Sequence, residues 1–385
     1  MFRTCSPLLT LQQLSRFLML AVVSFFLLAA CSSQKEVIQK PVFFPPPPDE
    51  PRLQFLTGFE DSSIFEEQKS TFSLILSGTE KLEADVRIFK PLGIAVYKGV
   101  VYVCDTYQGT VLVIDPAKYK FERLRGSSGS GTLKKPLNLT VSDDGTLFVA
   151  DVFRKEVLTY TAEGDFIRAF GKDILKKPVG VAADRENIYV LDNADSIIKV
   201  LDRSTGALLR EIGSGTTAED TLWRPFAITR DTKGYLYVTN TGTCKVIKYD
   251  ADGHALLSFG NLGDAFGDFT RPRGVAVDQE GRIFVVDASF QNVQIFNEQT
   301  RLLLPFGMPG LPRGSMNLPA GIAISSDRID YFLKFADPSF DVEQLVFITN
   351  QDGKDKVAVY GLGRLRSAPG AKSSASGGTA GSAAK

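Results

Sequence analysis

Side chains that commonly carry catalysis or bind metals are scarce in this sequence. It holds one histidine, His254, and four cysteines in 385 residues. His254 follows Asp252 and Gly253 in a segment typical of an exposed turn, so a Ser/His/Asp triad or a zinc site would depend on this single turn residue. No CxxCH motif is present, which excludes c-type haem attachment. We therefore expect no catalytic residues, no cofactor and no metal site.

Aspartate or asparagine recurs at the ends of six short apolar segments, such as VYVCD at residues 101–105. The six residues are Asp105, Asp151, Asp192, Asn240, Asp287 and Asn350. If they converged, four carboxylates at close range would repel one another and favour a calcium ion, which takes oxygen ligands. At a strand end, however, such side chains commonly accept hydrogen bonds from the next turn. We favour this structural role and keep calcium as the alternative.

A basic residue precedes five of six prolines that open similar apolar segments. These residues include Lys90, Lys135, Lys177, Arg224 and Arg271, whereas Leu318 stands at the sixth position. If the segments lie side by side, the residues share one face and form a candidate surface for an anionic partner, such as a polysaccharide, a phosphorylated lipid headgroup or an acidic protein. The alternative is that the long stems only cover apolar edges.

The six prolines mark an internal repeat. Pro91, Pro136, Pro178, Pro225, Pro272 and Pro319 follow one another at intervals of 42 to 47 residues. Each opens an apolar segment, a second segment ends in the Asp or Asn described above, a third follows, and in five units a fourth ends in glycine. Four short strands recurring at this period are the pattern of a β-propeller.

The sixth unit lacks a fourth strand, which would leave an unpaired edge. Residues 52–59, RLQFLTGF, match the fourth-strand pattern of FIRAFG at 166–171. We therefore predict an all-β, six-bladed β-propeller over residues 52–363, with its ring closed by the N-terminal strand.

The segments outside the propeller indicate export. Residues 17–30 form an uncharged run typical of a signal peptide, and the run ends in Leu28-Ala29-Ala30-Cys31, which resembles the bacterial lipobox. This predicts a signal peptide at 1–30, lipid attachment at Cys31 and, because Ser32 follows, transport to the outer membrane. Residues 31–51 with their proline run predict an extended tether, and 364–385, rich in Gly, Ser and Ala, a disordered tail.

The repeated pattern of PRGVAV at 272–277, FVVD at 284–287, VQIF at 293–296 and FG at 306–307 resembles NHL repeats. The whole arrangement resembles bacterial six-bladed NHL-repeat lipoproteins, although Asn138 and Ala227 replace the expected glycine in two units. The resemblance implies the fold but not one function, because NHL relatives include RNA-binding proteins, a peptide-amidating lyase, sensor domains and partner-binding proteins. The lyase would need several histidines around zinc.

Two insertions interrupt the repeat. One lies between Gly58 and Pro91 and includes Ser70–Gly78, for which a short helix is expected. The other, residues 328–343, carries Tyr331, Phe332 and Phe335 as candidate partner-binding residues. The alternative is that the two insertions pack together and fill the seam where the ring closes.

The sequence holds 44 basic and 44 acidic residues, so no nucleic-acid partner is expected. Cys104 and Cys244 fall in distant blades, which predicts two separate buried thiols. Together these features predict a non-enzymatic, lipid-anchored binding or scaffold protein of the cell envelope. The alternative is a calcium-dependent hydrolase or lyase that uses the central channel.

Overall fold

The computed structural model describes residues 40–68, 86–215, 217, 220–310 and 312–366. The chain divides into two units, Met1–Lys40 and Pro41–Lys385, and almost all described residues belong to the second. The predicted signal peptide, Cys31, the helix expected at Ser70–Gly78 and residues 367–385 lie outside the described residues. Among the described residues, no helix has the length and apolar character needed to cross a bilayer.

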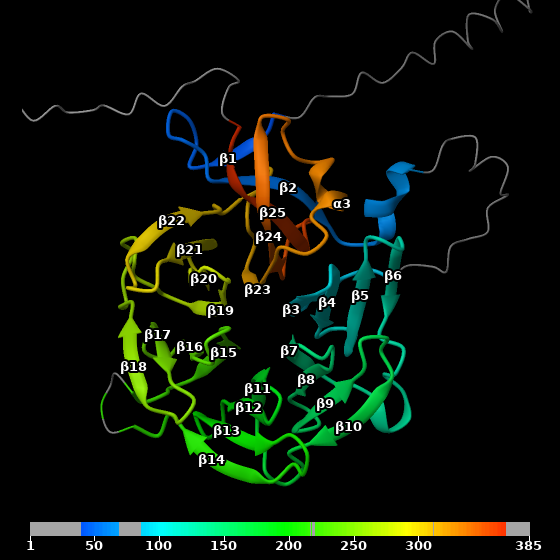
Figure 1. Ribbon diagram of the computed structural model, residues 1–385, viewed down its shortest axis with the longest axis vertical. Helices are drawn as coiled ribbons and strands as arrows, with labels where there is room; N and C mark the ends of the chain where they lie inside the picture. Colours follow the sequence, from blue (N-terminus) through cyan, green and yellow to red (C-terminus); the bar gives the residue numbers. More distant parts are fainter. Residues whose placement is uncertain (1–39, 69–85, 216, 218–219, 311, 367–385) are drawn as a thin grey trace, which may run out of the picture. The chain divides into compact units, whose positions relative to one another are not determined.

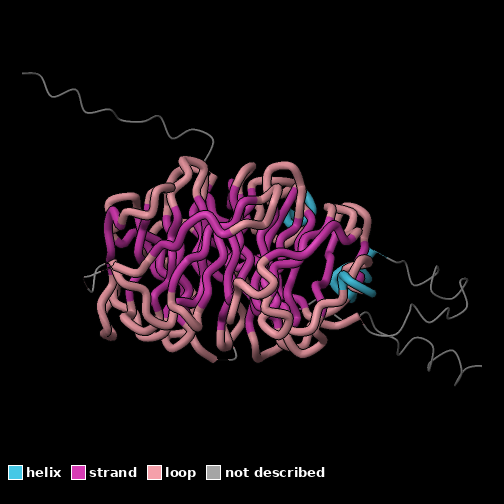
Figure 2. Tube along the Cα trace, turned by 90° about the horizontal axis from the view of Figure 1, so that it is seen from below, coloured by secondary structure: helices cyan, strands magenta, loops and turns pink. Residues whose placement is uncertain are grey.

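The second unit is a ring of six antiparallel blades, as predicted (Figure 1). Blades 1 to 3 comprise β3 (Pro91–Tyr97), β4 (Val100–Asp105), β5 (Thr110–Asp115) and β6 (Lys120–Arg123); β7 (Pro136–Val141), β8 (Leu147–Asp151), β9 (Glu156–Tyr160) and β10 (Phe166–Phe170); and β11 (Pro178–Ala183), β12 (Asn187–Asp192), β13 (Ile197–Asp202) and β14 (Leu208–Ile212). Blades 4 and 5 comprise β15 (Pro225–Arg230), β16 (Leu236–Asn240), β17 (Lys245–Tyr249) and β18 (Ala255–Phe259); and β19 (Pro272–Val277), β20 (Ile283–Asp287), β21 (Asn292–Phe296) and β22 (Leu302–Phe306). Figure 2 shows that the strands of this ring run between two layers of loops.

Blade 6 closes the ring by combining the two ends of the folded chain. It comprises β23 (Pro319–Ser325), β24 (Phe340–Asn350), β25 (Val357–Leu365), β2 (Leu53–Phe59) and β1 (Val42–Phe44). Strand β2 pairs antiparallel with β25, from Leu53 opposite Leu362 to Phe59 opposite Val357. The predicted closure by an N-terminal strand is therefore confirmed. In Figure 1 the blue β2 lies beside the red end of the chain.

The blade differs from the prediction at both of its boundaries. Strand β1 lies within the segment predicted to be a tether and pairs with β2, with Phe44 opposite Leu53. Phe44 is 5% exposed and contacts the ring of Tyr360, so burial of aromatic surface holds this strand on the sheet. The folded unit therefore begins before residue 52, and β25 continues beyond residue 363.

The apolar core lies between blades. Because side chains alternate across each strand, every blade has two apolar faces, and each face packs against a neighbouring blade. One cluster joins Phe148 and Val157 of blade 2 to Ile188 and Leu201 of blade 3. The remaining helical elements, η1 (Ser62–Gln68), η2 (Gly129–Gly131) and α3 (Asp330–Leu333), lie in connections.

Close packing of the innermost strands explains one feature of the repeat. A Cβ atom on Gly321 would lie 2.2 Å from the Leu92 carbonyl oxygen, and one on Gly274 would lie 2.6 Å from the Ala320 carbonyl oxygen. Only glycine fits where these backbones approach. Glycine at these two positions is therefore a packing requirement, whereas blades 2 and 4 accommodate Asn138 and Ala227.

Candidate functional site

The six strand-ending Asp and Asn residues are buried in turns, each 0–1% exposed. In blade 5, Asp287 Oδ2 accepts hydrogen bonds from the backbone N–H groups of Thr270 (2.8 Å) and Arg271 (2.9 Å). Its Oδ1 accepts from those of Ser289 (2.8 Å) and Phe290 (3.1 Å). The carboxylate thus joins the loop that precedes β19 to the turn that follows β20.

The two asparagines bind the preceding loop with a different hydrogen-bond pattern. Asn240 Oδ1 accepts from the Trp223 N–H (2.6 Å), and its Nδ2 donates to the Thr221 carbonyl (2.9 Å). Asn350 likewise accepts from Asn317 N–H (3.1 Å) and donates to the Asp355 carbonyl (2.8 Å). Asn240 thus holds only the loop that precedes β15, whereas Asn350 joins the loop before β23 to the turn after β24.

These connections build one surface, here called the loop face. It consists of the loops that precede the six blade-opening prolines and the turns that follow β4, β8, β12, β16, β20 and β24. Backbone hydrogen bonds join loop and turn within a blade, for example Thr106 N–H to Lys90 carbonyl (3.0 Å) and Ala288 N–H to Arg271 carbonyl (3.0 Å). The predicted basic residues thus lie at joined loops and turns.

The predicted cations on this face differ in their partners. Lys90 pairs with Asp352, with 3.2 Å between Nζ and Oδ1. Lys177, Arg224 and Arg271 are exposed and Lys135 is half-buried, and none of these four has a carboxylate within ion-pair distance among the described residues. Their charges remain available to an anionic group in solution.

A second charged cluster on the face is internally neutralised. Lys199 is 4% exposed, and its Nζ lies 2.6 Å from Asp195 and 3.3 Å from Asp192. Burial opposes the charge of Lys199, but the hydrogen bonds and charges of the two carboxylates outweigh it and raise its pKa. Hydrogen bonds from Lys176 and Lys199 lower the pKa of Asp195. This cluster stabilises blade 3.

Sequence analysis missed the exposed aromatic residues of the loop face. Phe89 is 41% exposed, Tyr107 72%, Phe153 67% and Trp223 58%. The backbone N–H of each donates to a strand-ending side chain: Phe89 and Tyr107 to Asp105, Phe153 to Asp151, and Trp223 to Asn240. Their proximity to the predicted turn residues was the available signal. The buried turns therefore fix the backbone that presents these rings.

Between blades 2 and 3 the loop face contains a groove of about 660 Å³. Phe153, Lys134, Lys155, Lys172 and Asp173 are among the residues that line it, and Arg154 is paired with Glu156 at 2.7 Å. Lys134, Lys155 and Lys172 form no ion pair in the described part of the chain. The groove therefore offers cations beside an exposed aromatic ring.

The central channel has a different chemistry. Its cavity of about 200 Å³ is lined by the innermost strands of the blades, mainly by apolar side chains such as Leu92, Leu137 and Phe226. The polar side chains in the lining are Asn138, Thr140 and Thr229. No carboxylate, imidazole or thiol lines this cavity among the described residues.

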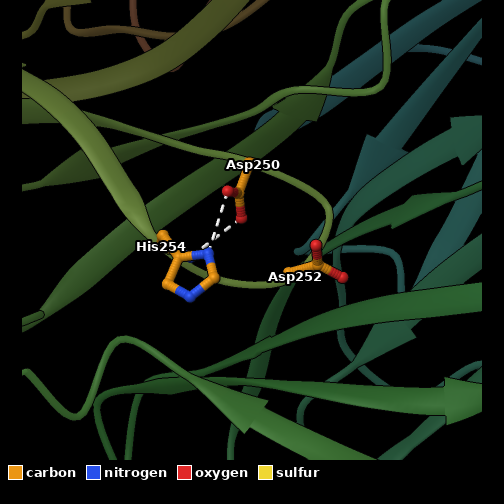
Figure 3. Close-up of side chains that lie close together, drawn as sticks. All are labelled: Asp250, Asp252 and His254. Carbon is orange, nitrogen blue, oxygen red and sulfur yellow. Dashed lines mark hydrogen bonds and ion pairs between the residues drawn. The ribbon is translucent and has the colours of Figure 1, made fainter.

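One group of side chains in the described residues has metal-ligand character, namely Asp250, Asp252 and His254, whose ligand atoms lie within 4.8 Å of one another (Figure 3). It occupies the turn between β17 and β18. His254 Nδ1 lies 3.0 Å from Asp250 Oδ2, and the imidazole is 78% exposed. Hydrogen bonds from the His254 backbone and ring lower the pKa of Asp250. The group is a surface turn stabilised by its own hydrogen bonds.

The second insertion, residues 328–343, packs against the sheet of blade 6 and against the first insertion. Phe332 is 2% exposed, and its ring lies 5.6 Å from that of Phe347, because α3 turns it onto the blade 6 sheet. Tyr331 Oη donates to the Ile64 carbonyl (2.9 Å), so the two insertions meet at the seam between blades 6 and 1. Phe332 is therefore a core residue in this structure, whereas Tyr331 and Phe335 are half-buried.

Cys104 and Cys244 are free and buried, as predicted. Burial raises the pKa of both thiols, which keeps them protonated and unreactive.

With this geometry in place, comparisons define the class of protein. A family model described as NHL repeat matches residues 269–296, which span β19 to β21 of blade 5. The fold is a six-bladed β-propeller, and its blade 5 matches the NHL repeat. A search of curated proteins finds no match.

Solved structures share the fold at low sequence identity. A gluconolactonase from Xanthomonas campestris is 15% identical, with a TM-score of 0.53, and the match covers 84% of this chain and 98% of that one. An auxiliary nutrient binding protein from Bacteroides thetaiotaomicron is 13% identical, with a TM-score of 0.52 and coverage of 72% and 70%. A protein of unknown function from the same species is 15% identical, with a TM-score of 0.53 and coverage of 71% and 70%. These matches establish the fold alone.

Proposed function

We propose that this protein is a non-enzymatic binding or scaffold protein of the cell envelope, held on the outer membrane by a lipid at Cys31. Its loop face engages a protein partner or an envelope polymer. The observation that carries the proposal is the set of exposed rings whose backbone is fixed by buried Asp and Asn side chains.

Fixed, exposed aromatic residues are favourable for binding. Aromatic rings bury a large area with few rotatable bonds, and a preorganised backbone reduces the entropy lost on association. Phe153 and Trp223 are more than half exposed, so a partner that covered these rings would gain the free energy of removing apolar surface from water. Neighbouring unpaired cations such as Lys177 add attraction for an anionic partner. The same face thus offers apolar contact and charge.

The alternative, a calcium-dependent hydrolase or lyase in the channel, receives less support from the geometry. Such chemistry would need oxygen ligands and a proton-transfer group near the axis. The four strand-ending aspartates are occupied by backbone hydrogen bonds in the turns, and the described channel lining offers no carboxylate. Because this fold serves both enzymes and binding proteins, the site must decide between them.

Capture of the membrane-anchored protein after mild crosslinking tests the proposal. We expect a stoichiometric partner that is retained by the wild type and lost with Phe153→Ala and Trp223→Ala combined. Leu208→Ala with Leu256→Ala, at exposed positions on the outer strands β14 and β18, is the matched control and should retain the partner. A partner held equally by both variants would place binding elsewhere, and tightly bound calcium without a partner would favour the enzyme.

A further inference from the structure

Arg273 is a buried cation without an acidic partner. It is 7% exposed, and it forms no ion pair with any carboxylate of the described chain. Burial, with a smaller contribution from the charge of Arg271, lowers its pKa to about 10. A buried charge usually has a partner, because the loss of hydration is costly.

Its position in the repeat places it at the mouth of the channel. Each blade has one residue between the opening proline and the position usually occupied by glycine, and the other five are Leu92, Leu137, Val179, Phe226 and Ala320. All five line the channel cavity. Arg273 is therefore the one charged residue at this repeat position; it lies beside the cavity lining, which it contacts through Phe226.

Neighbouring blades hold the guanidinium group in place. Its Cζ lies 5.3 Å from the centre of the Phe226 ring of blade 4, and its Nη1 donates to Gln351 Oε1 of blade 6 at 3.3 Å. The backbone is fixed as well, because Thr239 Oγ1 donates to the Arg273 carbonyl at 2.6 Å. The group thus lies between blades 4 and 6 with little freedom to turn toward solvent.

The remaining donors suit one kind of ligand. Nε and Nη2 have no acceptor in the described part of the chain, yet neither atom is sealed from solvent. These two N–H groups are the side of a guanidinium that binds both oxygens of a carboxylate. Phe226, which stacks on Arg273, also lines the apolar channel.

We propose that Arg273 binds a small carboxylate whose apolar part enters the central channel. The carboxylate supplies the missing counter-charge, and Leu92, Leu137 and Phe226 contact the apolar part. A cavity of about 200 Å³ suits a short chain rather than a lipid or a sugar polymer. This site is independent of the proposed role of the loop face.

Calorimetric titration of the full chain with acetate, butyrate and hexanoate tests the site. We expect affinity to rise about fourfold per added methylene, which corresponds to the ~0.8 kcal/mol gained on burial of a methylene group. Hexanamide, which lacks the charge, should bind at least tenfold more weakly than hexanoate. Equal binding of hexanamide and hexanoate, inorganic phosphate binding as tight as that of hexanoate, or no binding at all would overturn the proposal.

Variants separate the site from general charge. Arg273→Gln should weaken hexanoate binding more than tenfold, and Arg273→Lys should weaken it less than Arg273→Gln because it keeps the charge but loses the fork. Arg301→Gln, at an exposed cation in the turn between β21 and β22, should change it less than threefold. Without ligand, Arg273→Gln should melt at or above the temperature of the wild type, since it removes an unpaired buried charge. Wild-type affinity in Arg273→Gln, or equal weakening by Arg301→Gln, would refute the assignment.

Discussion

Replacing Asp287 tests whether the strand-ending carboxylates hold the loop face together. Asp287→Ala removes the acceptor for four backbone N–H groups, those of Thr270, Arg271, Ser289 and Phe290. Asp287→Asn keeps one acceptor oxygen but places an NH₂ group against two of the four donors. We therefore expect a graded loss of stability, larger for alanine than for asparagine.

The magnitude follows from the number of donors left without a partner. At about 1 kcal/mol for each, near the low end for a buried donor, Asp287→Ala costs about 4 kcal/mol and Asp287→Asn about 2 kcal/mol. About 300 folded residues give an unfolding entropy of about 0.6 kcal/mol per degree, so 1 kcal/mol shifts the melting temperature by about 1.6 °C. The expected decreases are about 6 °C and about 3 °C.

Thermal unfolding followed by circular dichroism measures these shifts. Asp252→Asn is the matched control, because Asp252 is exposed in the turn of Figure 3 and makes no hydrogen bond to a described residue. It should shift the melting temperature by less than 1 °C. A melting temperature of Asp287→Ala within 1 °C of the wild type would refute the reasoning. Equal losses for Asp287→Ala and Asp287→Asn would show that the acceptor oxygen kept by asparagine contributes nothing.

Three further predictions concern closure, acid stability and the thiols. Phe55→Ala in β2 removes a 2% exposed ring that packs on Tyr360, with ring centroids 5.4 Å apart. The substitution should lower the free energy of unfolding by about 3–5 kcal/mol and speed proteolytic cleavage near the closing strand. An unchanged digestion rate would contradict this role of β2. Folding lowers the pKa of Asp195, so the stabilisation by this carboxylate is present above the unfolded pKa of about 3.9 and is lost as the pH falls below that value. In denaturant titrations, Asp195→Asn should therefore lose less stability than the wild type between pH 5 and 3. Parallel stability curves for the two proteins would contradict this prediction. Cys104 and Cys244 should react with a thiol reagent only after unfolding, and rapid modification of the native protein would show that they are accessible.

The blades were predictable because local signals agree with long-range packing. Prolines mark where the first strand of each blade begins, and Asp or Asn marks where the second ends. Strand β1 was not predictable, because Val42–Phe44 stands beside a proline run and its pairing with β2 depends on the closed ring. Phe332 also required the structure, since a ring in an insertion is predicted to be exposed unless the sheet beneath it is known.

The site was predictable only where it follows the repeat. Lys135 and Arg271 were found because basic residues recur before the blade-opening prolines. Phe153 and Trp223 were missed because each position carries a ring in only two of the six blades: Tyr107 and Phe153 stand two residues after a strand-ending Asp, and Phe89 and Trp223 stand two residues before a blade-opening proline. Arg273 was missed for a related reason, because the residue after the blade-opening proline varies, and its charge becomes unusual only when that position is known to border an apolar channel.

The arrangement of buried turns explains how one fold can present different surfaces. Asp151 accepts the N–H groups of Lys134, Lys135, Phe153 and Arg154, so a single buried carboxylate fixes the backbone of four loop-face residues. These bonds involve only backbone donors, so the side chains can change without loss of the connection. A substitution such as Phe153→Ala should therefore alter binding while leaving the melting temperature nearly unchanged, whereas Asp151→Ala should reduce both. Binding that survives both Phe153→Ala and Asp151→Ala would show that the partner does not contact this part of the loop face.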